Sequence, residues 1–285
     1  MKTDTSRRSF LGAAASIAGL SAAGVSPALA RIEPAPWGIK LGIATYSLRS
    51  FERPQAIQMI KSLQISWVSI KDTPHLRQTL SLDEVRAGAR EFTDAGLKIM
   101  SGGNVDMTKD TTVDDLRKHF EYAKAAGMPM MVCAPTHDNI KMVESLVKEY
   151  NIRIAIHNHG PEDKHFPTPQ SVLEVVRKLD SRCGLCMDVG HSARAGVDVV
   201  ETIGLAGTRL FDMHVKDLSD MSKRESQVDV GDGDMPIPGI FKQLKKMNYQ
   251  GCVNLEYEIN AKDPMPGMQR SYSYMRGVLA GLAGA

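Results

Sequence analysis

The sequence has no long apolar run after its first thirty residues, few cysteines and almost no net charge. Its formal charge is +2, and Lys2, Arg7 and Arg8 set against Asp4 account for that excess, so the rest of the chain is neutral. Binding to nucleic acid needs a basic footprint, so this charge balance argues against a nucleic-acid partner. A membrane helix needs about 20 consecutive apolar residues, so no span is expected beyond residue 30.

The four cysteines are too few for a disulfide scaffold, and each lies in an apolar run. Cys183 and Cys186 have C-x-x-C spacing, but they fall within an expected strand rather than at the start of a helix. They are therefore interpreted as buried, apolar side chains, with a redox or zinc role as the alternative.

The first thirty residues have the features of an export signal. Ser6–Leu11 carries paired arginines, an Ala-rich apolar stretch follows, and Ala28–Ala30 matches a small-x-small cleavage pattern. We predict a twin-arginine (Tat) signal peptide over residues 1–30, a mature domain over 31–285, a periplasmic location and no membrane contact after cleavage. An uncleaved anchor is the alternative, for which the stretch is short.

From residue 39 onwards, apolar strand-like runs alternate with helix-periodic segments. Eight such pairs predict an α/β fold, a single (β/α)8 TIM barrel with parallel strands. One helix, 81–95, is bounded by a capping box at its start and by Gly96 at its end. The expected strands are Ile39–Leu48, Trp67–Lys71, Leu97–Met100, Met130–Ala134, Ile152–His157, Cys183–Asp188, Arg209–Val215 and Cys252–Tyr257.

Polar residues stand near the ends of four successive expected strands. Side chains alternate faces along a strand, which places His157, Asp188, His214 and Glu256 on the inner face at the carboxyl ends, where barrel enzymes have their active sites. Buried carboxylates are costly alone, so several that converge imply a compensating cation. The imidazole and carboxylate donors predict one divalent metal ion (Mn, Zn, Co or Fe), with Mg less favoured. Taken singly, each residue could instead be an ordinary hydrogen-bonded or ion-paired rim residue.

Three motifs stand beside these residues: the D-x-x-H of Asp188–His191, the H-x-K-D of His214–Asp217 and the loop Gly231–Pro236 that precedes Glu256. With these motifs and Glu256, the chain resembles the xylose isomerase-like TIM barrels, which include sugar isomerases and epimerases, inosose dehydratase and endonuclease IV. The resemblance covers the mature chain.

The resemblance implies a metal-ligand set with one departure from the family. In the ketose epimerases the ligands are a strand-five Glu, the Asp of D-x-x-H, a strand-seven His and a strand-eight Glu. The matching residues here are His157, Asp188, His214 and Glu256. The strand-five Glu also serves the epimerases as one of two acid/base carboxylates, and a His replaces it here. His157 can bind metal or move a proton, and His159 or Glu162 are the alternative strand-five ligands.

The resemblance also implies chemistry at a carbon next to a carbonyl. A metal that binds both neighbouring oxygens of a sugar would lower the pKa of the C–H bond between them, and Glu256 or His157 would take the proton as the catalytic group. Return of the proton gives isomerisation or epimerisation, and loss of a β-substituent gives elimination. The expected substrate contacts, His191 by resemblance and the others by their place at the rim, are Tyr46, Lys71, His75, His159, His191, Arg194 and Lys216.

Three functions from different classes follow. The first is a metal-dependent isomerase or epimerase of an unphosphorylated sugar, with a lyase or dehydratase of a keto-sugar, keto-glycoside or inosose as its runner-up. The second is a barrel that only binds carbohydrate, motivated by the missing strand-five Glu. The third is an endonuclease IV-like phosphodiesterase, against which the neutral charge counts.

Asp232 and Asp234 are interpreted as turn residues. Substrate identity and assembly into a homo-oligomer stay open.

Overall fold

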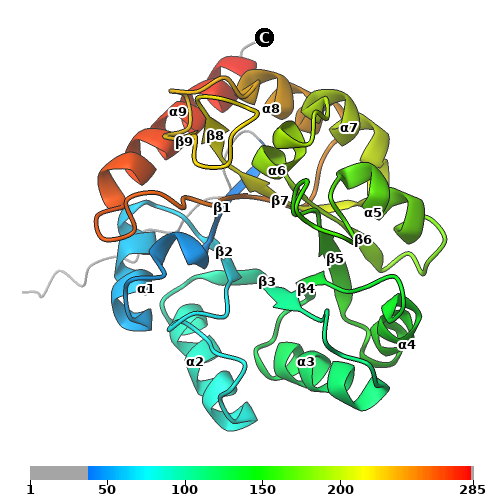
Figure 1. The fold of residues 1–285 in the computed structure, drawn as a ribbon. Helices are drawn as coiled ribbons and strands as arrows, with labels where there is room; N and C mark the ends of the chain where they lie inside the picture. Colours follow the sequence, from blue (N-terminus) through cyan, green and yellow to red (C-terminus); the bar gives the residue numbers. More distant parts are fainter. Residues whose placement is uncertain (1–37, 284–285) are drawn as a thin grey trace, which may run out of the picture. The chain divides into compact units, whose positions relative to one another are not determined.

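The structure is a computed structural model that describes residues 38–283. Eight parallel strands close into a barrel in the order β1-β2-β3-β4-β5-β6-β7-β10. Figure 1 shows them as an inner ring with the helices around it. This confirms the predicted single (β/α)8 TIM barrel. The predicted signal peptide over 1–30 lies outside the described residues.

The elements alternate along the chain as expected. The barrel strands are β1 Lys40–Ala44, β2 Trp67–Ile70, β3 Lys98–Asp106, β4 Met130–Ala134, β5 Arg153–His157, β6 Cys183–Asp188, β7 Leu210–Val215 and β10 Cys252–Leu255. The α-helices are α1 Arg53–Ser62, α2 Leu82–Asp94, α3 Val113–Ala125, α4 Ile140–Tyr150, α5 Pro169–Val176, α6 Val189–Arg194, α7 Val199–Ala206, α8 Ile237–Lys246 and α9 Met265–Ala283. The shorter elements are the 3-10 helices η1 Thr45–Leu48 and η2 Gly207–Arg209, and the hairpin strands β8 Asp217–Leu218 and β9 Gln227–Val228.

The strands are buried on both faces because helices cover the outside of the barrel. Every residue of β6 and β7 is buried, which explains their nearly continuous apolar sequence. Strand register places His157 beside Cys186, and Asp188 beside His214. The carboxyl ends of β5, β6, β7 and β10 therefore lie side by side at one end of the barrel.

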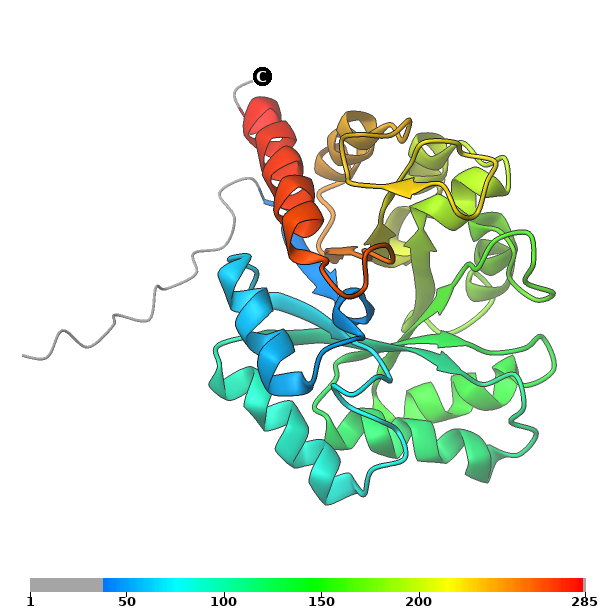
Figure 2. The same cartoon turned by 60° about the vertical axis from the view of Figure 1, so that its left-hand side comes forward.

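The helices pack through one apolar face each. In α8 the buried residues Ile237, Ile240, Phe241 and Leu244 recur with helical spacing. Figure 2 shows α9, in red, lying next to α8, in orange, on the outside of the barrel. The predicted capping box of α2 is present, with Ser81 as the N-cap. Over residues 38–283, no helix combines the length and apolar character that crossing a membrane requires.

Several expected boundaries were wrong. The first strand ends at Ala44 rather than Leu48, because Ser47 Oγ donates to the carbonyls of Ala44 and Leu255 and the backbone turns into η1. The third strand is longer than expected, reaching Asp106. The last strand ends at Leu255, before Glu256. The short helix α6 and the β8–β9 hairpin were not predicted.

Candidate metal centre

Asp188 connects the end of β6 to the start of α6. Its Oδ1 accepts a hydrogen bond of 2.8 Å from the backbone N–H of His191 as the N-cap of α6. The D-x-x-H spacing is thus the spacing of a helix cap. Because the cap uses only Oδ1, Oδ2 is left to face the barrel axis, 3.7 Å from His157 Nε2.

Asn158 fixes the backbone at the same place. Its side-chain oxygen accepts from Asp188 N at 3.0 Å, and its amide nitrogen donates to Asp188 O and Ser192 Oγ. This buried amide ties the ends of β5 and β6 together. The role of Asn158 was not predicted from the sequence, although its place between two candidate histidines was a usable signal.

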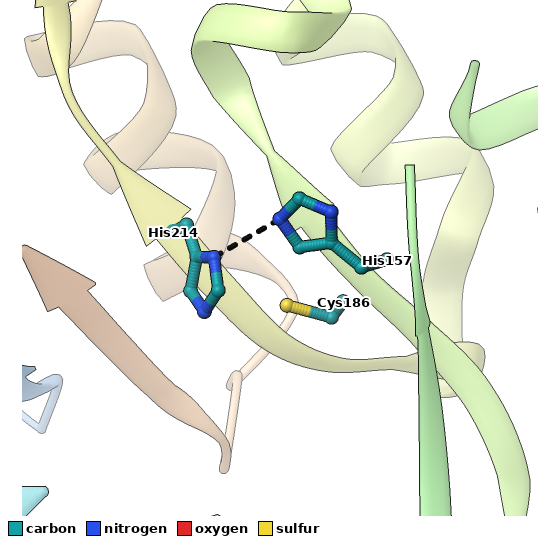
Figure 3. Close-up of side chains that lie close together, drawn as sticks. All are labelled: His157, Cys186 and His214. Carbon is teal, nitrogen blue, oxygen red and sulfur yellow. Dashed lines mark hydrogen bonds between the residues drawn. The ribbon is translucent and has the colours of Figure 1, made fainter. Parts of the chain in front are cut away.

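Four side chains converge at the carboxyl end of the barrel. His157, Asp188, His214 and Glu256 each offer one donor atom within 4.8 Å of the others, and all four are buried. His157 Nε2 lies 3.1 Å from His214 Nδ1, and His214 Nδ1 lies 3.3 Å from Glu256 Oε2. Figure 3 shows the two imidazole rings turned toward one another. The four residues named from the sequence are therefore brought together.

These donors fit a divalent metal ion. Of the atoms that face one another here, Asp188 Oδ2 is buried and accepts no hydrogen bond, which is costly for a polar atom, and its counter-charge is the Lys216 ammonium group at 3.1 Å. Burial lowers the pKa of His157 to about 3, so its imidazole is neutral and has a lone pair to give to a cation. Two imidazoles and two carboxylates form a donor set typical of Zn, Mn, Co or Fe.

Cys186 lies beside the two imidazoles. Its sulfur, His157 and His214 form a second group whose donor atoms lie within 4.8 Å of one another (Figure 3). The thiol also belongs to a small apolar cluster inside the barrel, with Met130, Val132, Ala155 and Phe211. Burial raises the pKa of the thiol well above its usual value. Cys186 is free and buried, as its interpretation as an apolar side chain predicted.

Two lysines predicted to contact substrate lie inside the centre. Lys216 Nζ is 3.1 Å from both Asp188 Oδ2 and Glu256 Oε2 and also pairs with Glu258. Lys71 Nζ is 3.0 Å from Glu256 Oε1. Burial would raise the pKa of Glu256, but His214, Lys216 and Lys71 outweigh it and hold this pKa well below its usual value. Glu256 is therefore ionised with both oxygens engaged.

The floor beneath the centre is also polar. Asp212 accepts hydrogen bonds from Ser101 Oγ and Asn254 Nδ2, each at 2.7 Å. Burial raises the pKa of Asp212 to about 6. Because Ser101 lies on β3, Asp212 on β7 and Asn254 on β10, these contacts place the three side chains inside the barrel.

The rim on the side of β5 and β6 contains a linked group. Arg194 binds Glu162 with two contacts, of 2.7 and 3.1 Å, and its Nη2 lies 2.8 Å from His191 Nδ1. Glu162 is thereby held at the rim. It was considered as an alternative strand-five ligand, but it is not among the four converging donors. His159 is exposed, and its ring centroid lies 4.7 Å from that of His191 and 5.4 Å from that of His157.

Tyr46 and His75, both expected to contact substrate, differ in accessibility. Tyr46 is 37% exposed, and the Arg49 guanidinium stacks on its ring. His75 is fully buried, and its Nδ1 lies 2.7 Å from Thr73 Oγ1. The loop after β2 buries the ring of His75, and its contact with substrate stays a prediction.

Asp217 links two of the motifs seen in the sequence. Its carboxylate accepts from the backbone N–H groups of Gly231, Gly233 and Met235, at 2.8, 3.3 and 3.0 Å. A Cβ at Gly233 would lie 2.3 Å from Asp217 Oδ1, so glycine is required there. The H-x-K-D motif thus anchors the Gly-rich loop at the end of β7. Asp232 and Asp234 in that loop are exposed, as expected of turn residues.

Sequence comparisons point to one family. The family model described as xylose isomerase-like TIM barrel matches residues 57–277. An inosose dehydratase from Mesomycoplasma hyopneumoniae strain 7448 is 25% identical over 152 residues, which cover 47% of this chain and 50% of the relative. A rhizopine catabolism protein from Rhizobium meliloti is 27% identical over 142 residues, covering 45% and 42%. The chain thus covers about half the length of the curated relatives it matches.

Solved structures share the fold at low identity. The IolI protein with a bound zinc atom has a TM-score of 0.70 and 18% identity, over 85% of this chain and 99% of that one. The 3-keto-D-glucoside 4-epimerase YcjR from E. coli has a TM-score of 0.69 and 14% identity, over 84% and 99%. A probable 3-DHS dehydratase from Bacillus anthracis has a TM-score of 0.69 and 15% identity, over 83% and 98%. At these identities the similarity establishes the fold alone.

Proposed function

The chain belongs to the xylose isomerase-like TIM barrel family, and from this premise we propose that it is a divalent-metal-dependent enzyme that removes a proton next to a carbonyl of a small, unphosphorylated carbohydrate. The observation that carries the proposal is the convergence of four buried donor atoms within 4.8 Å at the carboxyl end of the barrel. The relatives named as a dehydratase and an epimerase support an enzyme with a sugar-like substrate.

In this proposal His157, Asp188, His214 and Glu256 hold the ion. When bound, the ion supplies Lewis acidity, which polarises the substrate oxygens and lowers the pKa of the adjacent C–H bond. The mixed nitrogen and oxygen donors support Zn, Mn, Co or Fe. The zinc atom bound to the IolI protein supports the same class of ion.

The lysines would stabilise the charge that the reaction creates. Three carboxylates meet here, those of Asp188, Glu256 and Glu258, and they face two ammonium groups, those of Lys71 and Lys216. The side chains alone therefore carry one excess negative charge, and a divalent ion turns this into one excess positive charge. Fixed positive charge in a buried site favours a transition state in which negative charge develops on substrate oxygens.

Three residues compete for the role of base. Glu256 and His157, the groups predicted from the sequence, also belong to the converging donor set, so metal binding would occupy them. His159 is exposed at the mouth, and its imidazole has no hydrogen-bond partner among the residues that the structure describes. The geometry therefore favours His159 for proton transfer, with Glu256 and His157 mainly as ligands.

Elimination is the second candidate reaction. The strand-five position holds His157, so the paired carboxylates that would exchange a proton symmetrically between two faces of a substrate are missing. An imidazole base and a different acid suit the removal of a proton and the departure of a β-substituent. The inosose dehydratase relative supports this variant of the proposal.

Solvent deuterium incorporation tests the proposal. Mature protein loaded with Mn is incubated in deuterated water with a panel of ketoses, inososes and 3-keto-glycosides, and the recovered sugars are analysed by NMR. We expect deuterium at one carbon, lost in Glu256→Gln and kept in Glu174→Gln, an exposed residue of α5. An unsaturated product would assign a lyase. Bound metal and saturable sugar binding without any exchange would instead identify a carbohydrate-binding barrel.

We further propose that residues 1–30 direct export to the periplasm through the twin-arginine pathway, with the metal loaded beforehand. The paired arginines Arg7 and Arg8 support this. Replacing both with lysine is expected to leave the precursor in the cytoplasm, as measured by cell fractionation. An unchanged distribution of the protein would contradict this route.

A further inference from the structure

Arg194 is held rigidly at the edge of the centre. Its side chain is 7% exposed, and it uses Nη1 and Nη2 to bind both oxygens of Glu162. A planar guanidinium in such a two-point contact has a fixed orientation. The remaining hydrogen of Nη2 points at His191 Nδ1, 2.8 Å away.

This contact decides which nitrogen of His191 carries the proton. An arginine side chain has five N–H donors and no acceptor, and it does not lose its proton in proteins. The bond between the two residues can therefore form only if Nδ1 of His191 offers its lone pair. A neutral imidazole with a lone pair at Nδ1 has its hydrogen on Nε2.

The other side of the ring is open to a ligand. Among the described residues, none forms a hydrogen bond with His191 Nε2, and this atom is not fully buried. The ring centroid lies 5.7 Å from that of His157 and 4.7 Å from that of His159. The backbone of His191 is fixed by its hydrogen bond to Asp188 Oδ1.

We propose that Arg194 is a positioning residue that holds His191 in the Nε2–H tautomer, so that His191 presents a fixed hydrogen-bond donor to an oxygen of the substrate. His191 then cannot act as the base, which leaves proton removal to His159, Glu256 or His157. That the acceptor is a carbohydrate oxygen rests on the proposed function. The tautomer itself follows from the contact with Arg194 alone.

Gly160 makes room for this arrangement. It has a φ of +88°, and a Cβ at this position would lie 2.7 Å from Arg194 Nη2 and 3.1 Å from His191 Nδ1. An alanine there would push the guanidinium away from the imidazole. Gly160→Ala therefore perturbs the contact without changing either partner.

The tautomer can be read directly by NMR. We would label the histidines of the zinc-loaded protein with 15N and record long-range 1H–15N correlations across neutral pH. His191 is expected to show the Nε2–H pattern in the wild type and a mixture of both tautomers in Arg194→Met and Gly160→Ala. Arg194→Lys, which retains a donor without an acceptor, is expected to restore the wild-type pattern in part. The exchange reaction with sugar should fall in Arg194→Met, but by less than the roughly 100- to 1,000-fold loss typical of removing a hydrogen-bond donor altogether, because part of the protein keeps the Nε2–H tautomer.

Two controls separate positioning from stability. Arg182→Met removes a similar two-point arginine–carboxylate pair, with Asp180 at 2.8 and 3.0 Å, and should leave the His191 signals and exchange unchanged. Glu162→Gln removes the ion pair but keeps Arg194 as the donor to His191, so the Nε2–H tautomer of His191 should persist. A proton on Nδ1 in the wild type, or an unchanged tautomer in both Arg194→Met and Gly160→Ala, would overturn the proposal. So would a changed tautomer with full exchange activity. Failure of every sugar to exchange would refute the proposed function while the NMR result still stands.

Discussion

His157 is the residue at which this site departs most from the family resemblance. Its Nε2 lies 3.1 Å from His214 Nδ1 and 3.7 Å from Asp188 Oδ2. We expect His157→Glu to keep metal binding but shift the preference toward harder cations, because a carboxylate oxygen replaces an imidazole nitrogen. The ratio of the Kd values for Zn and Mn should change about tenfold in favour of Mn, or about 1.4 kcal/mol.

Competition titration with a chromogenic chelator measures this ratio. His165→Glu is the matched control, since His165 lies in the loop after β5 and is not among the converging donors. It should leave the ratio unchanged. An equal ratio in His157→Glu and the wild type would show that His157 is not a ligand.

At the scale of single residues, the alternation of side chains along a strand predicted which of them lie on its inner face. Alternation placed His157, Asp188, His214 and Glu256 on the inner face, and the structure brings them together. Strand alternation did not predict that the Asn158 side chain binds the backbone of Asp188 or that Arg194 contacts His191. Those contacts depend on the conformation of the loop after β5, where Gly160 has a φ of +88°. The periodicity of the sequence does not predict the conformation of a loop.

At the scale of elements, helix caps were predictable and strand ends were not. Ser81 Oγ accepts from Glu84 N at 3.3 Å and Glu84 Oε2 accepts from Ser81 N at 2.8 Å, as the local sequence predicted. The end of β1 depends instead on Ser47, which bonds to the carbonyl of Leu255 on β10, a residue distant in sequence. Local chemistry can be predicted from the chain, whereas a contact between distant residues requires the fold.

The cap of α2 yields a stability prediction. Ser81→Ala should lower the free energy of unfolding by about 1 kcal/mol, because the N–H groups at the start of the helix lose a partner. Urea titration measures the change. Ser273→Ala is the control, since its exposed hydroxyl bonds only to Gln269 O within helix α9, and a change below about 0.5 kcal/mol is expected. Equal effects of both substitutions would show that the capping box does not stabilise α2.

At the scale of the whole molecule, buried histidine makes stability depend on pH. Burial lowers the pKa of His75 to about 4 from the ordinary 6.5. As the pH falls, the unfolded chain therefore binds this proton before the folded protein does, and stability is lost between about pH 6.5 and about pH 4. The full loss from this one group is about 3 kcal/mol.

Chemical unfolding at a series of pH values tests this contribution. His75→Gln removes the titrating group, so its stability should fall less steeply than that of the wild type in this window, whatever offset the substitution adds. His137→Gln, at an exposed position, should keep the wild-type slope. Parallel curves for wild type and His75→Gln would exclude a role for His75 in acid sensitivity.

The last prediction at this scale concerns metal and the stability of the fold. A ligand present at 100 times its Kd stabilises the folded state by about 2.7 kcal/mol, which raises the Tm of a domain of this size by about 5 to 10 °C. Metal removal should not unfold the protein, because Lys71 and Lys216 already pair with the carboxylates of Asp188 and Glu256. We expect chelated protein to melt cooperatively at a lower Tm and to recover on addition of Zn.

The Tm values of Glu256→Gln and Glu174→Gln, measured by calorimetry, distinguish the loss of an ion bound at this centre from a general effect of the chelator. Loss of a ligand in Glu256→Gln should abolish most of the shift in Tm, whereas Glu174→Gln should retain it. If chelation unfolded the chain, the lysines would not be sufficient counter-charges for the buried carboxylates. If Zn shifted Tm equally in both variants, the ion would be bound away from Glu256, and the charge argument for the centre would fail with it.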